Sequence, residues 1–341
     1  MLDRLIQQAI AQVLTPIFDP TFSPFSYGFR PGRSAHQAVR AAQGHIQEGY
    51  RQVVDVDLER FFDRVGHDVL MARVARKVSD PKVLKLIRRY LDAGVMVEGV
   101  KRSVAEGTPQ GSPLSPLLSN IMLDDLDIEL EARGLRFVRY ADDIRVFVRS
   151  KRAAQRVMDG ITHVVEGRLK LKANRAKSAI CGATKASLLG LAFFFASGTV
   201  KIRTAPKAVR WLEERLREIT RRNWRVSMGH RITTLNRFTA GWMAYFRIAD
   251  TPKVFAELDG WLYRRMRQVR WKEWKRYSAK RRNLRALGIP DSSARRWAAS
   301  SKGCWRIAGS VVLQRALLRT HWDDLGLQSL NRTWHRLRTT A

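Results

Sequence analysis

The sequence has little cysteine and about half as many acidic as basic residues. Its two cysteines, Cys181 and Cys304, exclude a disulfide scaffold and a four-thiolate zinc site built from one chain. No run of apolar residues is close to the length of about 18 that a membrane-spanning helix needs, and the N-terminus does not resemble a signal peptide. We therefore expect a protein of a reducing compartment with no membrane partner. The motifs GxGxxG and GxxxxGK[ST] are also missing, so a Rossmann or P-loop nucleotide site has no support.

Positive charge is what the chain has in excess. Its 341 residues include 63 Lys and Arg against 31 Asp and Glu, a formal net charge of +32. Residues 1–200 carry a net charge of +9, residues 201–341 one of +23, and all ten tryptophans follow residue 200. Cations interleaved with large aromatic rings are typical of nucleic-acid binding, because they neutralise phosphates and stack on bases. The alternative is that tryptophans anchor a core beneath a solvated basic face, and we expect most of the ten to be core.

This step in composition predicts a domain boundary near the turn-forming Ser197-Gly198 and Pro206. Short strand patterns, hairpins and helical periods alternate before it, which predicts an α+β fold with an antiparallel sheet. After it the apolar period is helical. We expect domains at 1–200 and 201–310, with a short basic extension at 311–341 that is a possible DNA-binding tail.

Local signals predict where several elements begin. Ser34 and Ser115 each precede a helical apolar period and are expected to be N-caps, and Ser150 is expected to start a helix. The alternation of Ile144, Val146 and Val148 predicts a strand whose apolar side chains share one face.

Acidic residues interrupt two apolar strand patterns. Asp57 lies beside Asp55 in VVDVD, and Asp142-Asp143 lies at the tip of RYADDIRVF. A tight turn alone could explain an isolated Asp pair. If the two strands are adjacent, however, the carboxylates converge and need cations between them. Oxygen ligands suit Mg²⁺, and two such ions about 3.5–4 Å apart would activate a 3′-hydroxyl and stabilise the leaving pyrophosphate.

Five segments carry a family resemblance. In chain order, VVDVDLERFFD, GTPQGSPLSP, YADD, LKLKANRAKS and LLGLAF resemble successive motifs of reverse transcriptases. The upstream SYGFRPGRSAHQAV and the Trp/Arg-rich C-terminal half resemble the bacterial group II intron-encoded proteins in particular. The resemblance implies a right-hand polymerase palm with partial fingers, followed by a helical thumb or maturase domain.

Carried over residue by residue, the resemblance assigns roles at the site. It implies that Asp57, Asp142 and Asp143 are catalytic and hold two Mg²⁺ ions with the Leu58 carbonyl. The implied nucleotide-binding residues are Leu58, Phe62, Gln110, Gly111 and Lys177. Phe62 would be the ring that excludes a ribose 2′-hydroxyl, or otherwise an ordinary core Phe. Gln110 and Gly111 would pack against nucleotide and template, or form a plain turn, and Lys177 would reach the triphosphate or remain solvated.

Two sets of basic residues are candidates for nucleic-acid binding. Arg30 and Arg33 would lie near template or nucleotide. A second cluster occupies the remainder of a helix that carries an apolar stripe, and one acid, Glu273, lies among its members; these are Arg264, Arg265, Arg267, Arg270, Lys272, Lys275 and Arg276. These positively charged side chains would repel one another without a polyanion, which favours phosphate binding over a merely solvated face.

The expected function is that of an RNA-directed DNA polymerase of a group II intron, which also binds its intron RNA to assist splicing and retrohoming. Its partners would be that RNA, an RNA template with a DNA primer, target DNA and dNTPs. The location would be cytoplasmic and nucleoid-associated. We expect the family's N-terminal fingers region and its HNH-type nuclease to be missing from this chain. A catalytically impaired splicing maturase and a domesticated reverse transcriptase in host defence remain alternatives.

Overall fold

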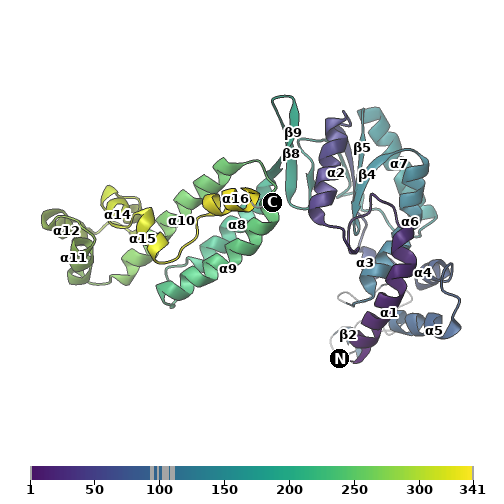
Figure 1. The fold of residues 1–341 in the computed structure, drawn as a ribbon, viewed down its shortest axis with the longest axis horizontal. Helices are drawn as coiled ribbons and strands as arrows, with labels where there is room; N and C mark the ends of the chain where they lie inside the picture. The colour runs from purple at the N-terminus through teal and green to yellow at the C-terminus, as the bar shows by residue number, and fades with distance from the viewer. Residues whose placement is uncertain (1, 93–95, 98–99, 102–106, 108–111, 340–341) are drawn as a thin grey trace. The chain divides into compact units, whose positions relative to one another are not determined.

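The structure is a computed structural model that describes residues 2–92, 96–97, 100–101, 107 and 112–339. It divides into two compact units, Met1–Lys201 and Ile202–Ala341, and the division falls inside strand β9 (Thr199–Thr204). Each unit is described by itself below (Figure 1). None of the described helices is both long and apolar enough to cross a membrane.

The first unit mixes helices with short strands. Its helices are α1 (Leu2–Phe18), α2 (Ala35–Gln47), α3 (Phe61–Arg64), α4 (His67–Val74), α5 (Pro81–Asp92), α6 (Ser115–Ala132) and α7 (Lys151–Gly167), with a 3-10 turn η1 (Asp19–Thr21). Its strands are β1 (Gln52–Val56), β2 (Met96–Val97), β3 (Val100–Lys101), β4 (Arg136–Tyr140), β5 (Asp143–Val148), β6 (Ala179–Gly182), β7 (Ser187–Leu188) and β8 (Leu191–Ala196). The predicted α+β class is confirmed.

A sheet in the order β4-β5-β1-β6 organises this unit, and its neighbours pair antiparallel. Val54, Ile144 and Val146 are fully buried on one face, in a core shared with α6 and α7. On the other face, Phe147 is buried beside His45 of α2, with ring centroids 5.5 Å apart. Figure 1 shows α2 and α7 on opposite sides of β4 and β5. The sheet is therefore covered on both faces at the Phe147 end.

One of the two predicted N-caps is confirmed, and the helix expected from Ser150 begins at Lys151 with Ser150 as its N-cap. The Ser34 hydroxyl accepts a hydrogen bond from the Gln37 amide, and the Gln37 side chain accepts one from the Ser34 amide. The Ser150 hydroxyl accepts from the Ala153 amide. The expectation for Ser115 is wrong: it is the first residue of α6, and the N-cap is Leu114. Proline at the start of the helix presets the backbone there without a side-chain cap.

The second unit is helical after β9. Its helices are α8 (Pro206–Ile219), α9 (Met228–Phe246), α10 (Pro252–Glu273), α11 (Tyr277–Ala286), α12 (Asp291–Ala298), α13 (Cys304–Ala308), α14 (Val311–Ala316), α15 (Arg319–Asp324) and α16 (Leu330–Thr339). The apolar stripe of α10 is buried at Phe255, Leu262 and Met266. The buried Asp259 carboxylate accepts from the Leu330 amide at 2.8 Å and the Asn331 amide at 3.0 Å. It therefore stabilises the N-terminus of α16.

The tryptophans are less buried than expected. Trp242, Trp271, Trp322 and Trp334 are buried, whereas Trp211 is 54% exposed. The expectation that most of the ten belong to the core is wrong. Lys and Arg side chains cover indole rings within the unit, as Arg264 does over Trp305 at 4.1 Å. Part of the interleaving of cations and aromatics therefore serves cation–π pairs inside the protein.

Candidate active site

The pairing of β1 with β5 brings together two of the predicted carboxylates. Val56, the last residue of β1, is opposite Ile144 of β5. Asp57 directly follows Val56 and Asp143 directly precedes Ile144, so the strand alternation directs both side chains to the face opposite to Ile144. The two strands are therefore adjacent, which is the condition on which convergence of the carboxylates depended. Asp57, Asp142 and Asp143 are all partly exposed, so they are accessible from solvent.

The tip between β4 and β5 is held by a preceding loop. Tyr140 pairs with Asp143, so Ala141 and Asp142 form a two-residue turn in which Ala141 has a positive φ of 58°. The Tyr27 amide donates to the Arg139 carbonyl at 2.9 Å. A Cβ atom at Gly28 would lie 2.2 Å from the Ala141 nitrogen. Glycine is therefore required for the loop to approach the backbone of the turn.

Arg139 joins this turn to α6. Its guanidinium is fully buried and donates to the Asp127 carboxylate, to the Asn120 side-chain oxygen at 2.9 Å and to the Ala141 carbonyl at 3.0 Å. The Asn120 amide in turn donates to the Gly28 carbonyl at 2.9 Å. The position of the turn thus depends on a buried polar network, which is stable because its charges are paired and hydrogen-bonded.

Asp57 is held from its other side by residues 172–178. The Asp57 amide donates to the Ser178 hydroxyl at 3.1 Å, and the Asp57 carbonyl accepts from the Asn174 amide at 2.8 Å. Leu58 is buried and forms an isolated bridge with Ala173. Lys177 is exposed on this same segment. Lys177 therefore lies between Asn174 and Ser178, the two residues whose hydrogen bonds hold the backbone of Asp57.

Negative charge accumulates on this face of the sheet. The pKa of Asp55 is raised to about 6, mainly by burial and further by the charges of Asp143 and Asp57, against the opposing effect of Arg145. Burial is also the main cause that raises the pKa of Asp143, and Asp142 and Asp57 add to it. A cation between these carboxylates would relieve their repulsion.

An arginine supplies one such cation. The Arg145 Nη1 atom lies 2.5 Å from the Asp55 carboxylate and also contacts the Asp143 carboxylate. Within the described residues, no group of three or more His, Cys, Asp or Glu side chains is arranged to hold a metal ion. The structure therefore places the three predicted ligands in one region, without assembling them into a ready metal site.

The remaining predicted nucleotide-binding residues are only partly described. Phe62 belongs to α3 and packs partly buried against the core. The centroids of its ring and the Phe61 ring lie 5.2 Å apart in an edge-to-face arrangement. Gln110 and Gly111 lie outside the described residues. Their roles stay predictions.

Comparison with protein families adds to this geometry. Residues 1–193 match the family "Reverse transcriptase (RNA-dependent DNA polymerase)". The chain belongs to the reverse transcriptase family. Residues 209–288 of this reverse transcriptase match "Group II intron, maturase-specific domain". The predicted resemblance to group II intron reverse transcriptases with a maturase domain is confirmed.

Individual proteins are also similar to the chain. The chain is 33% identical over 216 residues to Protein YkfC of Escherichia coli, covering 52% of this chain and 57% of that protein. It is 39% identical over 125 residues to the Group II intron-encoded protein LtrA of Lactococcus lactis, covering 37% of this chain and 21% of that protein. A solved telomerase from Candida tropicalis is similar over 97% of this chain and 60% of its own, with 11% identity and a TM-score of 0.46. The matched region thus spans little more than half of YkfC and about a fifth of LtrA.

In this reverse transcriptase, many basic side chains of the cluster on α10 form hydrogen bonds or ion pairs with other groups of the protein. Arg265 donates to the Thr220 hydroxyl at 2.5 Å, and Arg267 donates to the Ala308 carbonyl at 2.8 Å. Arg264 donates to the Trp305 carbonyl, and Arg270 pairs with Glu273 at 3.0 Å. These four side chains are partly buried and bind protein groups, whereas Lys272, Lys275 and Arg276 are exposed.

A basic groove lies beside the end of α10. It has a volume of about 870 Å³ and is formed by the loop between α8 and α9 together with the last turn of α10. Its lining includes four exposed cations, Arg222, Arg225, Lys272 and Lys275. The partly exposed Trp224 also lines it, and its ring is covered at 5.1 Å by the buried Arg231. Sequence reasoning missed the loop cations, because they follow no helical period.

Arg30 and Arg33 differ in their surroundings. The Arg30 side chain is 5% exposed, pairs with Asp19 at 2.7 Å and donates to the Ser23 and Ser26 carbonyls. Arg33 is exposed and stacks over Tyr27 at 5.6 Å. The contacts of Arg30 are those of a residue that holds its own loop together, and a nucleic-acid role of either residue stays a prediction.

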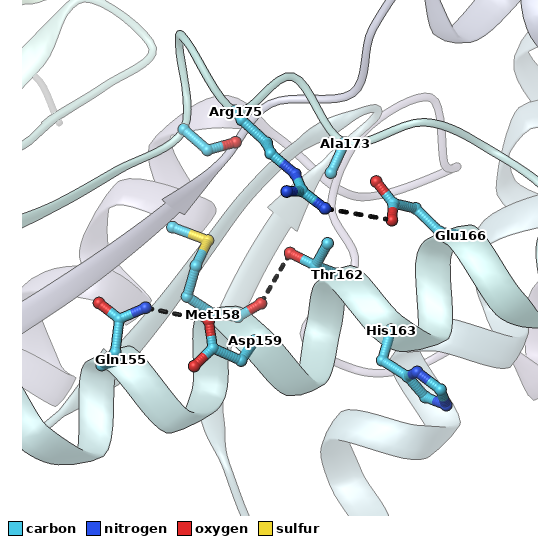
Figure 2. Close-up of a pocket in the computed structure, with 9 residues that line it drawn as sticks. Gln155, Met158, Asp159, Thr162, His163, Glu166, Ala173 and Arg175 are labelled. Carbon is cyan, nitrogen blue, oxygen red and sulfur yellow. Dashed lines mark hydrogen bonds and ion pairs between the residues drawn. The ribbon is translucent and has the colours of Figure 1, made fainter.

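A separate hollow lies beside α7 (Figure 2). It has a volume of about 460 Å³ and is lined by α7 residues together with Ala173, Arg175 and Ser178. Figure 2 shows Arg175 reaching over toward Glu166, 3.6 Å away. None of the three candidate aspartates lines this hollow. It adjoins the segment that supports Asp57 but is not the candidate active site.

Proposed function

We propose that this reverse transcriptase is an active RNA-directed DNA polymerase encoded by a group II intron. The observation that carries the proposal is the β1–β5 register: Asp57 directly follows, and Asp143 directly precedes, the paired Val56 and Ile144. Both aspartates and Asp142 in the adjoining turn are partly exposed. Phosphoryl transfer requires little from a protein beyond positioning and charge stabilisation. The Gly28 loop and the Arg139 network supply positioning for Asp142 and Asp143.

The donor set of this site fits magnesium. Carboxylate oxygens are the ligands that Mg²⁺ prefers. The charges of Asp142 and Asp57 add to burial in raising the pKa of Asp143, so a bound cation would also relieve repulsion between these carboxylates. Asp57, Asp142, Asp143 and the Leu58 carbonyl would hold the ions. When bound, two Mg²⁺ ions would activate the primer hydroxyl and stabilise the leaving pyrophosphate.

The second unit would bind RNA through its basic groove. Arg222, Arg225, Lys272 and Lys275 would neutralise phosphates, and Trp224 offers an aromatic ring beside them. Such neutralisation allows RNA helices to pack closely, which is how a maturase would favour a splicing-competent intron. Retrohoming into target DNA would combine this binding with DNA synthesis.

Primer extension on an RNA template tests the polymerase. We expect Mg²⁺-dependent incorporation of dNTPs by the purified chain, and a loss of at least about a hundredfold on Asp142→Asn, by analogy with other removals of transition-state charge stabilisation. The matched control is Asp159→Asn on α7, which removes the same charge outside the active site.

The outcomes separate the two main functions. If Asp142→Asn extends primers as the unaltered protein does, the active-site assignment is wrong. If neither protein extends a primer but both bind intron RNA and accelerate its splicing, the chain is an RNA-binding maturase without polymerase activity.

A further inference from the structure

Arg145 occupies an unusual place for a basic side chain. It lies within β5, opposite Asp55 of β1, and it points to the same face as Asp143 two residues earlier. Its side chain is only 12% exposed. The neighbouring positions 144 and 146 are apolar and face the core, so the alternation of the strand directs Arg145 into the carboxylate region.

The arginine is shared between two acids. Its Nη1 atom lies 2.5 Å from Asp55 and contacts Asp143, so one end of the guanidinium joins adjacent strands. Arginine keeps its charge at all ordinary pH values, and the two N–H groups of Nη1 can serve two carboxylates at once. Leaving these acids without a cation would be costly where water is partly excluded.

We propose that Arg145 is the resident counter-ion of this site: it holds Asp55 and Asp143 together in the metal-free protein and thereby weakens divalent-cation binding. The proposal rests on the polymerase function proposed above, because that function requires Asp143 as a metal ligand. Asp143 cannot give the same oxygen fully to both cations. Arg145 is therefore a positioning residue that acts through Asp143, and metal binding includes the release or sharing of this ion pair.

Arg145→Asn tests the proposal, with Mn²⁺ as the probe and free Mn²⁺ measured by electron paramagnetic resonance. We expect the affinity for Mn²⁺ to rise on the order of tenfold, because a charge close to the ion is removed. Thermal unfolding of the metal-free variant should occur at a lower temperature, and Mn²⁺ should restore more stability than in the unaltered protein. Arg145→Lys keeps the charge but not the rigid planar guanidinium, and its Mn²⁺ affinity should fall between those of Arg145→Asn and the unaltered protein.

Arg149→Asn is the matched control, because Arg149 follows the same strand but stacks over Tyr50 at 4.9 Å. It should change neither Mn²⁺ affinity nor the metal-dependent shift in unfolding temperature. An unchanged Mn²⁺ affinity in Arg145→Asn would overturn the proposal. If that variant folds neither with nor without Mn²⁺, Arg145→Lys decides, and an affinity equal to that of the unaltered protein overturns the proposal.

This result is independent of the polymerase assay. A tighter Mn²⁺ site that is lost on Asp142→Asn, in a chain that extends no primer, would refute the polymerase and leave the counter-ion role intact. Primer extension that depends on Asp142, together with an unaltered Mn²⁺ affinity in Arg145→Asn, would support the polymerase and refute the counter-ion role.

Discussion

At the scale of single residues, Phe62 tests how the site selects its nucleotide. Its ring is partly buried against Phe61 on α3, five residues after Asp57. If this ring excludes a ribose 2′-hydroxyl, Phe62→Ala should increase incorporation of ribonucleotides relative to deoxynucleotides by about tenfold or more, equivalent to a steric penalty of about 1.4 kcal/mol. Competition between dNTPs and rNTPs during primer extension measures it. Phe61→Leu should lower stability and leave the preference unchanged, and an unchanged preference in Phe62→Ala removes the gate role.

Two neighbouring acids on α6, Asp124 and Asp125, are expected to make stability depend on pH in opposite ways. Burial is the main cause that raises the pKa of Asp124 to about 6, and Asp127 adds to it. Because this value lies above that of the unfolded chain, ionisation of Asp124 costs stability as pH rises from about 4 to 6. Asp124→Asn should therefore be more stable than the unaltered protein above pH 6 and gain nothing below pH 4, as measured by urea unfolding.

Asp125 is the matched comparison. Burial opposes its ionisation, but hydrogen bonds and charges from Arg76 and Arg73 prevail and lower its pKa. Asp125→Asn should therefore lose stability at neutral pH, and the loss should shrink as pH falls through the lowered pKa. Parallel pH profiles for the two variants would contradict both assignments.

At the scale of elements, the turn between β4 and β5 depends on a loop distant in sequence. A Cβ atom at Gly28 would lie 2.2 Å from the Ala141 nitrogen, so Gly28→Ala must displace the backbone next to Asp142. We expect a loss of stability of roughly 1–3 kcal/mol and a larger loss of primer extension than stability alone explains. Gly44→Ala, in open space on α2, should be neutral or stabilising. Normal extension by a folded Gly28→Ala protein would show that the turn tolerates this displacement.

The elements show what could be predicted from sequence. The alternation at Ile144, Val146 and Val148 and the stripe on α10 were sufficient, because apolar period directly reports which face is buried. The pairing of Arg139 with Asp127 and of Arg145 with Asp55 was not predictable, because it depends on which elements meet. The prediction that most tryptophans are buried was wrong for the same reason. A helical period shows that a face is apolar, but not how completely neighbouring elements cover it.

At the scale of the whole molecule, an excess of 32 positive charges leaves open which of them meet RNA. The structure separates those in the second unit by their contacts. Arg265 and Arg267 bind protein oxygens, whereas Lys272 and Lys275 line an open groove. Charge alone attracts RNA from any direction, but only side chains able to reach phosphates release counterions locally.

This separation predicts a difference in salt dependence. Lys272→Gln with Lys275→Gln should reduce the slope of log affinity against log salt by about 0.7 for each lost phosphate contact, with little change in unfolding temperature. Arg265→Gln with Arg267→Gln removes the same charge but should lower the unfolding temperature, because Thr220 and Ala308 lose their donors, and should change the slope less. Filter binding of intron RNA between 50 and 300 mM KCl (roughly the range in which counterion release dominates) measures the slopes. Equal slope changes in the two pairs would show that binding responds to total charge, and the groove would then have no special part in it.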